Sequence, residues 1–420
     1  MKREKQKRYI VLIQEESTKK TLSAMKKELG TTVVSSEELS SKVKANTILN
    51  NGDGIYYKNL GIAVMPNMEE SKLMNATSSK GSILYWEEER IFYTVGELEQ
   101  IEEVKETISL LNLQIQTLEN TLKQNIKKPW DEATFGLNAI GLKESKYTGK
   151  NINICILDTG LYKNHPDFQQ RNIIGKSFVD GESWDYDGNG HGTHVTGTSA
   201  GNIAKDTQKR YGIASESNIF IAKVLSDAGS GLTSSILDGI DWAMEKDCRV
   251  ISMSLGSSVQ IGENPSPIFE RVGRKALEKN TLIIAASGND SKRPHQVPRP
   301  VSSPANAESI LAVSALDRNL SVANFSNAGV NTADGGRVDI AAAGVNVFSS
   351  YSINASDGNL YKRLNGTSMA TPHVSGVAAL YFEAFPHLTA AEIWLKIEKS
   401  AKELQNQLLR DVGSGMVQAI

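Results

Sequence analysis

The stretch "NINICILDTG", residues 151–160, is a continuous apolar run that ends at an aspartate. Similar runs follow it, separated by segments with helical patterns: "NIFIAKVL", "CRVISMSL", "TLIIAAS" and "SILAVSAL". Strands that are apolar on both faces indicate a parallel sheet that is covered by helices on both sides. The sequence therefore predicts a three-layer α/β fold with a central parallel sheet for residues 129–420.

Asp158 directly follows the first of these apolar runs and precedes Thr159 and Gly160. Parallel sheets bind ligands at the carboxyl ends of their strands. A carboxylate at the end of a buried strand needs a partner, and an imidazolium is one of the few groups that keeps it ionised. The alternative is an aspartate that caps a turn or a helix.

His191 lies in "GNGHGTHVTGTSAG", residues 188–201, where glycines bring the chain close before a helix of small residues. A buried histidine is more often a packed core residue than a catalyst. His194 completes an H-x-x-H pair that would suit zinc, but no glutamate follows His191 and no third ligand is evident. The sequence therefore disfavours zinc and leaves the catalytic interpretation of His191 open.

Ser368 lies in "NGTSMATPHVSG", residues 365–376, before an Ala/Val-rich segment with helical character. The N-terminus of a helix stabilises an oxyanion through its dipole and its unpaired N–H groups. A serine hydroxyl is a poor nucleophile without a base, so the alternative is an ordinary helix cap. Asn289 ends the strand "LIIAASGND", and its amide can donate to the same oxyanion.

The order of these residues distinguishes between families of hydrolases. In α/β-hydrolases the acid follows the serine, and the sequence around the serine reads G-x-S-x-G. Here Asp158 precedes His191 and Ser368, and "GTSMA" lacks the final glycine. The order Asp, His, Ser instead matches a different arrangement of the same three side chains.

Three motifs, "ILDTGLYKNHPDF", "GHGTHVTGT" and "NGTSMATPHVSG", resemble the signatures of subtilisin-like serine peptidases, from about Phe135 to the closing "GSGMVQAI". The resemblance implies a serine endopeptidase with a subtilisin-like catalytic domain. It assigns four roles: Asp158 orients the imidazole, His191 is the general base and then acid, Ser368 is the nucleophile, and Asn289 is the oxyanion donor.

The resemblance also implies substrate-binding residues, because a substrate of this family pairs as a β-strand with two edge segments. These segments correspond to "SDAGSGL" and "SMSLGS". The implied residues are Gly229, Gly231, Leu232, Ser254, Leu255, Gly256, Ala286, Ser287, Gly288 and Ser302. Asp290 lies near the rim of the first pocket, where an acid favours a substrate Lys or Arg; large uncharged side chains are the alternative.

Residues 1–94 are predicted to form a small α+β unit with the βαββαβ order of a ferredoxin-like fold. A turn in "ILNNGDGIYYKN" is expected to form a hairpin, and "SILYWEEERIFYTV" to form one long final strand. This unit resembles the inhibitory propeptide of the family. The resemblance implies an intramolecular inhibitor, and hence a self-inhibited, self-processing zymogen.

Residues 95–128 are predicted to form an amphipathic linking helix, which departs from the family pattern. Its apolar residues recur three and four apart: Ile101, Val104, Ile108, Leu111, Ile115, Leu118 and Leu122. Packing on a neighbouring domain and self-association as a coiled coil both fit this pattern. The insertion leaves two candidate cleavage points, Lys127-Lys128 and the segment just after Tyr93.

No cofactor is needed for the expected chemistry, and the resemblance leaves a structural calcium ion open. Asp131 and Asp167 are the candidate ligands. The segment "DYDGNG", residues 185–190, imitates the first half of an EF-hand loop, but its twelfth position is Thr196 rather than the required glutamate.

The amino-acid composition limits the classes of partner that are expected. Lys and Arg total 46 against 48 Asp and Glu, so the global charge favours neither nucleic acid nor an anionic membrane, and a polypeptide substrate is expected. The first apolar run, Tyr9 to Ile13, is too short for a signal peptide, and no transmembrane helix is evident. We expect a cytoplasmic protein, or an extracellular one if a signal was trimmed. A binding protein built on an inactive protease fold is the second functional hypothesis.

Overall fold

The computed structural model describes residues 7–14, 18–39, 45–77, 83–94, 133–331, 335–355 and 358–420. The predicted linking helix, the Lys127-Lys128 pair and Asp131 lie outside these residues. Among the residues described, no helix combines the length and the apolar character needed to cross a bilayer.

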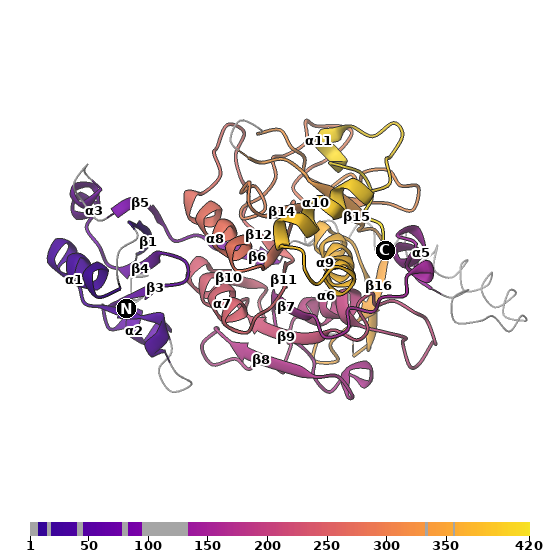
Figure 1. Cartoon of the computed structure of the whole chain (residues 1–420), viewed down its shortest axis with the longest axis horizontal. Coiled ribbons are helices and arrows are strands. Elements are labelled where there is room, and N and C mark those ends of the chain that lie inside the picture. Colours follow the sequence, from indigo (N-terminus) through magenta and orange to yellow (C-terminus); the bar gives the residue numbers. More distant parts are fainter. Residues whose placement is uncertain are drawn as a thin grey trace, which may run out of the picture.

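A seven-stranded sheet forms the centre of the larger unit (Figure 1), in the order β15-β14-β13-β11-β7-β9-β8. All its neighbouring strands pair in parallel. Its strands are β7 (Asn153–Asp158), β8 (Ile173–Ser177), β9 (Asn218–Lys223), β11 (Val250–Met253), β13 (Leu282–Ala286), β14 (Leu311–Leu316) and β15 (Ile340–Ala343). The continuous apolar runs that predicted this sheet form its buried strands.

Helices cover both faces of this sheet, so alternate residues of β7 pack into two different hydrophobic clusters. Ile154 and Ile156 belong to the cluster with α6 (His191–Ala200), α9 (Thr367–Ala384) and α10 (Ala390–Ser400). Cys155 and Leu157 belong to the cluster with α7 (Thr233–Glu245) and α8 (Pro267–Glu278). The prediction of a three-layer α/β fold with a central parallel sheet is therefore confirmed.

Shorter elements complete the larger unit. They are α5 (Phe135–Ala139), η3 (Leu142–Glu144), η4 (Pro166–Phe168), β10 (Ser230–Leu232), β12 (Leu255–Gly256), β16 (Val347–Ser350), β17 (Tyr361–Leu364) and α11 (Leu409–Val412). Strands β16 and β17 form an antiparallel pair.

The N-terminal unit, taken as the described residues between 7 and 94, has a five-stranded sheet in the order β2-β3-β4-β1-β5. Its elements are β1 (Arg8–Ile13), α1 (Thr18–Leu29), β2 (Val33–Ser35), η1 (Ser36–Glu38), α2 (Ala45–Asn50), β3 (Gly54–Tyr57), β4 (Ile62–Pro66), α3 (Glu70–Ala76) and β5 (Ile83–Glu88). The order β5-β1-β4-β3 corresponds to the expected βαββαβ arrangement, and β2 is added in parallel at the edge.

The hairpin turn was predicted at the wrong place. The "NNGDG" segment ends α2 instead, because Gly52 N and Asp53 N donate back to Leu49 O and Ile48 O. The β3–β4 hairpin turns at residues 58–61, where Gly61 N donates to Tyr57 O and Gly61 has a φ of 67°. An Asn-Gly turn signal suits a helix C-terminus as well as a hairpin, so the sequence did not separate the two.

The predicted long final strand is also divided. Strand β5 stays in the N-terminal sheet, whereas β6 (Ile91–Thr94) leaves it and lies between β10 and β12 of the larger unit. The chain is held at the break by α7: Arg90 N donates to Thr233 Oγ1 at 3.0 Å, and Ser234 N donates to Glu89 Oε1 at 2.9 Å. The N-terminal unit therefore reaches into the larger unit through a single strand (Figure 1).

Candidate active site

Asp158 and His191 meet at the carboxyl end of the central sheet. Asp158 ends β7 and His191 begins α6, and Asp158 Oδ1 lies 2.8 Å from His191 Nδ1. Thr159 N donates to the same carboxylate oxygen at 2.8 Å. His191 Nε2 is buried and has no hydrogen-bond partner among the described residues. The imidazole is thus held through one nitrogen, and its other nitrogen can serve as a base.

The surroundings of His191 raise its pKa above the ordinary 6.5. Burial is the largest effect and lowers the pKa, but the charge and the hydrogen bond of Asp158 together outweigh it. Because a general base must be neutral, activity that depends on His191 is expected to decline as the pH falls through this raised pKa.

Ser368 is the second residue of α9 and is fully buried. Its Oγ donates to Ser254 O at 3.0 Å, while Ser254 Oγ donates to Ser368 O at 2.8 Å. In this rotamer the hydroxyl does not bond to His191 Nε2. Helices α6 and α9 pack against each other, so His191 and Ser368 both lie at N-termini of contacting helices. Catalytic hydrogen bonds are often absent without substrate, and a rotation about χ1 redirects the hydroxyl.

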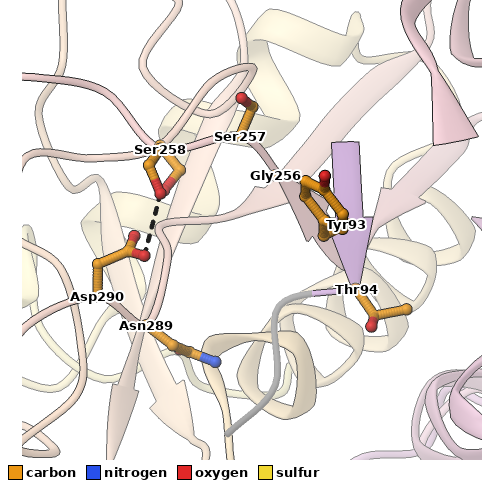
Figure 2. A pocket seen from close by; sticks show the side chains of 8 residues that line it. Tyr93, Thr94, Gly256, Ser257, Ser258, Asn289 and Asp290 are labelled. Atoms are coloured by element: carbon orange, nitrogen blue, oxygen red, sulfur yellow. Dashed lines mark hydrogen bonds between the residues drawn. The ribbon is translucent and has the colours of Figure 1, made fainter. Parts of the chain in front are cut away.

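Asn289 lies beside the same helix N-terminus. Its Oδ1 accepts from Thr367 N and from Thr367 Oγ1, each at 2.9 Å. These bonds fix the orientation of the carboxamide. Its NH₂ group therefore points away from Thr367 and can act as a donor (Figure 2). Sequence reasoning missed Thr367, although its position directly before Ser368 could have suggested it.

Strand β6 occupies the edges that were expected to bind substrate. It is antiparallel to β10, with Ile91 opposite Leu232 and Phe92 opposite Gly231, and it also pairs with Leu255 and Gly256 of β12. Thr94 N donates to Gly229 O at 2.8 Å. The structure therefore brings five of the ten predicted substrate-binding residues onto one strand of the N-terminal unit, in the manner of a bound peptide.

A cavity of about 330 Å³ lies beyond the end of β6 (Figure 2). Its lining residues are Tyr93, Thr94, Gly256, Ser257, Ser258, Asn289, Asp290 and Ser302. Gly256 and Ser302 were predicted here, whereas the predicted residues Ala286, Ser287 and Gly288 are fully buried behind the cavity. Ser257 ends the predicted edge segment "SMSLGS", and sequence reasoning missed Ser258, which follows it.

The Asp290 carboxylate is held in a fixed position in this cavity. Ser258 Oγ donates to Oδ1 at 3.0 Å, and the buried Asn327 donates its Nδ2 to Oδ2 at 3.0 Å. Asn327 Nδ2 also reaches Ser302 Oγ at 3.3 Å. The chain thus supports an exposed carboxylate on a rigid wall.

Asp167, a candidate calcium ligand, is held by two tyrosines. Its carboxylate accepts hydrogen bonds from Tyr211 and from Tyr361, at 2.8 and 2.9 Å, and calcium needs six to eight oxygen ligands. Within the described residues no three or more His, Cys, Asp or Glu side chains gather in a way that suits a metal. Because Asp131 lies outside those residues, the calcium expectation as a whole stays a prediction.

Two motifs with metal-like spacing have other partners. His194 Nε2 faces the carbonyls of Val347 and Lys362 at 3.0 and 3.2 Å, and burial lowers its pKa to about 3. Asp187 of the EF-hand-like segment is fully buried and accepts from Thr159 Oγ1 and Thr193 N, at 2.9 and 2.8 Å. Asp187 therefore orders the backbone around His191, whereas His194 connects α6 with β16 and β17.

Comparisons with known proteins agree with this geometry. A sequence profile described as the Subtilase family matches residues 149–415. Subtilisin DY of Bacillus licheniformis is 36% identical over 271 residues, which cover 64% of this chain and 90% of that protein. Subtilisin Savinase of Lederbergia lenta is 39% identical over 272 residues, 65% of this chain and 90% of its own. M-protease of Shouchella clausii is also 39% identical over 272 residues, which span 64% of its length.

Proposed function

Because this chain belongs to the subtilase family and is a serine endopeptidase, we propose that it is a self-inhibited precursor that cleaves its own chain. The observation that carries the proposal is the position of β6, which fills both substrate-binding edges with a segment of the N-terminal unit. A strand that pairs with both edges excludes other peptides while it stays in place.

The proposed chemistry uses four side chains. Ser368 Oγ attacks the scissile carbonyl while His191 Nε2 accepts its proton, and Asp158 holds the imidazole through Nδ1. The Asn289 NH₂ group and the Ser368 N–H stabilise the oxyanion that forms. His191 then returns the proton to the leaving amine, and a water molecule repeats the sequence to release the acyl group.

The register of β6 bears on the point of self-cleavage. Thr94 is the last described residue of the strand, and it contacts Gly229 and pairs with Leu255. Thr94 and Asn289 line the same cavity (Figure 2). This supports a first cut within a few residues after Thr94, rather than at Lys127-Lys128.

The first test is the intact mass of the purified chain over time, beside a Ser368→Ala variant. We expect the wild type to lose its N-terminal part while the variant stays whole, and the new N-terminus to follow Thr94 closely. Processing of Ser368→Ala in a protease-free preparation would refute the proposal. If both chains stay whole, labelling with a fluorophosphonate separates a closed precursor from an inactive fold, because only a functional serine reacts.

We further propose that the cavity favours a substrate Lys or Arg. Among the described residues that line it, Asp290 is the only charged one, and its position is fixed by Ser258 and Asn327. The large volume accepts a long side chain, and the carboxylate attracts its charge. Peptides that differ only by Lys or Gln before the cut test this: the Lys preference should disappear in Asp290→Asn. Equal cleavage of both peptides by the wild type would contradict it.

A further inference from the structure

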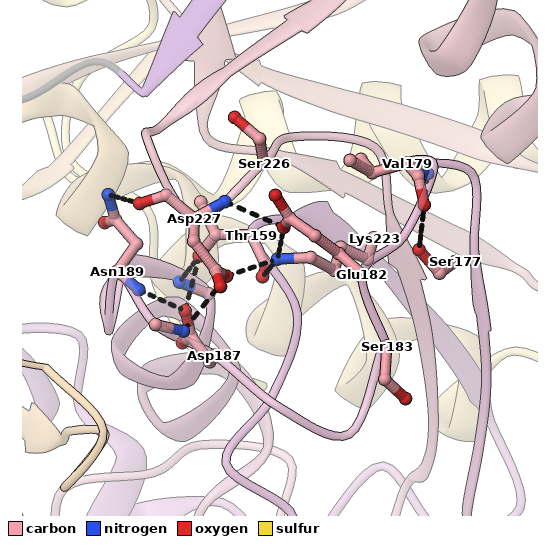
Figure 3. A network of polar contacts seen from close by, with 12 residues as sticks. Thr159, Ser177, Val179, Glu182, Ser183, Asp187, Asn189, Lys223, Ser226 and Asp227 are labelled. Atoms are coloured by element: carbon pink, nitrogen blue, oxygen red, sulfur yellow. Dashed lines mark hydrogen bonds and ion pairs between the residues drawn. The ribbon is translucent and has the colours of Figure 1, made fainter.

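A cluster of charged side chains lies beneath the candidate active site, at the end of β9 (Figure 3). Lys223 ends that strand, and its side chain is fully buried. Its Nζ lies 2.8 Å from Asp227 Oδ1 and 2.9 Å from Glu182 Oε2, and it also donates to Thr159 O. An ammonium has three protons to donate, so these three acceptors satisfy it completely.

One arm of this cluster leads to the Asp158–His191 pair. Thr159 follows Asp158, and its N donates to the Asp158 carboxylate at 2.8 Å. Thr159 Oγ1 donates to Asp187 Oδ1 at 2.9 Å, and Asp187 Oδ2 accepts from Thr193 N at 2.8 Å in the first turn of α6. Lys223 thus anchors the residue that connects the catalytic aspartate with the helix that begins at His191.

The other arm leads to the substrate edge. Asp227 N donates to Glu182 Oε2 at 2.9 Å, and Asp227 Oδ1 accepts from Gly188 N at 3.0 Å. Asp227 opens the turn that precedes β10, in which Gly229 N donates to Ser226 O at 2.8 Å. Gly229 O is the acceptor for Thr94 N of the bound strand. Asp227 therefore holds in place the turn whose carbonyl binds the peptide backbone.

We propose that Lys223 is a positioning residue that holds the substrate edge and the Asp158–His191 pair in one fixed geometry. The inference rests on the proposed roles of Asp158 and His191. Lys223 bridges three segments that are far apart in sequence, and its backbone pairs with that of Asp158 across the sheet. Because small misplacements of reacting groups lower rates strongly, loss of this bridge affects binding and chemistry together.

The test compares Lys223→Met with Asp227→Ala. Each variant is made as the full-length chain and is assayed after it has processed itself. Methionine keeps the length of the side chain but cannot bridge the two carboxylates, which are partly exposed and can be solvated. We expect Lys223→Met to lower kcat/KM about a hundredfold through both constants. Asp227→Ala removes the contacts to the substrate edge but leaves those of Lys223 with Thr159 and Glu182, so we expect a raised KM and a kcat that stays within about twofold of the wild type.

The pH profile distinguishes positioning from a simple effect of charge. If Lys223→Met loosens Asp158 from His191, the pKa of His191 falls and the acidic limb of kcat/KM moves to lower pH. If Lys223 acts only through its charge, its loss raises the pKa of His191 and the limb moves to higher pH. The second outcome would overturn the proposal, and so would an unchanged limb.

Lys275→Met is the matched control, because it removes a lysine that pairs with Glu278 on α8, outside the cluster around Lys223. It should leave kcat, KM and the pH limb unchanged. If Lys223→Met does not fold, the KM of Asp227→Ala still tests whether Asp227 holds the substrate edge. An unchanged KM in that variant would overturn this part of the proposal. These outcomes are independent of the proposed function, which fails only if Ser368→Ala remains active.

Discussion

The interior of the catalytic domain and its interface with the N-terminal unit both bury apolar side chains and carboxylates, but only at the interface do the carboxylates bond to side chains of the other unit. In the interior, Ile154 and Ile156 pack between the sheet and α6 and α9. At the interface, Ile55 and Ile62 join the apolar cluster of α7 and α8. Apolar burial stabilises the catalytic domain. It also stabilises the closed form, in which the N-terminal unit is docked and β6 occupies the substrate-binding edges.

Carboxylates of α7 make the interface different. Tyr57 OH donates to Asp238 at 2.8 Å, and Asn59 Nδ2 donates to Asp241 at 2.9 Å. Burial raises the pKa of Asp238 to about 7 and that of Asp241 above its ordinary value. Burial likewise raises the pKa of Asp339, inside the catalytic domain, to about 7, but its carboxylate accepts hydrogen bonds from residues of that same domain. At an interface that must open, the protonation of such groups sets how tightly it closes.

The largest predicted effects come from truncating apolar side chains, first at the interface and then in the interior of the catalytic domain. Phe92 of β6 is fully buried and packs edge-on against Phe269, with ring centroids 5.5 Å apart. Phe92→Ala should cost the closed form roughly 3–5 kcal/mol. Fluorophosphonate labelling of the full chain, which requires β6 to leave, should then accelerate about 10²–10⁴-fold.

The matched change in the interior is Ile156→Ala, in β7. It should lower the free energy of unfolding by about 2–5 kcal/mol and leave the labelling rate unchanged. Urea unfolding measures the first quantity. If Ile156→Ala accelerated labelling as much as Phe92→Ala, the two regions would not be energetically separate.

The second prediction concerns pH. Because the pKa of Asp238 is raised to about 7 in the closed form, closure is strongest when the carboxyl is protonated. The closed form should therefore weaken as the pH rises from about 4 towards 7, by up to tenfold per pH unit, and change little above that range. Glu89 and Asp241 oppose the charged form, while Tyr57 and Lys176 favour it.

Asp238→Asn provides the control for this titration, since the pKa of His191 also affects labelling. The variant keeps an acceptor for Tyr57 OH but cannot ionise. Its labelling rate should equal that of the wild type near pH 4 and be slower than that of the wild type at pH 8. Parallel pH profiles for the two proteins would show that Asp238 does not control opening.

The third prediction removes one hydrogen bond. Tyr57→Phe leaves the buried Asp238 without the phenol that stabilises its charged form, at a cost of about 1–3 kcal/mol. Labelling at pH 8 should accelerate, and the acceleration should largely disappear in the Asp238→Asn background, as a double-mutant cycle would measure. Additive effects would mean that the two side chains act separately.

The smallest effect is expected at the rim of the interface. Arg90 Nη1 lies 2.9 Å from Glu263 Oε1, with side chains that are 38% and 29% exposed. Such pairs contribute about 0–1 kcal/mol. Arg90→Ala should change labelling less than about fivefold, and the difference should vanish in high salt.

Local patterns in the sequence were sufficient to predict the central parallel sheet of the catalytic domain and the helices that begin at its candidate catalytic residues. Continuous apolar runs such as that ending at Asp158 predict buried parallel strands, because both faces of such strands must avoid water. The motifs around His191 and Ser368 place these residues at helix N-termini, which the structure also shows. The pairing of Asp158 with His191 is expected from the resemblance of their motifs rather than from neighbouring elements, since η4 and β8 separate β7 from α6 along the chain.

Only the tertiary structure decided how the N-terminal unit engages the rest. The residues from Ile83 to Thr94 read as one strand, yet they belong to two sheets, because Glu89 and Arg90 bond to the start of α7 far away in sequence. The anchoring of Asp290 by Asn327 and the bridge made by Lys223 are likewise long-range. Periodicity reports which face of an element is buried, whereas the choice of partner depends on side chains that meet only after the chain has folded.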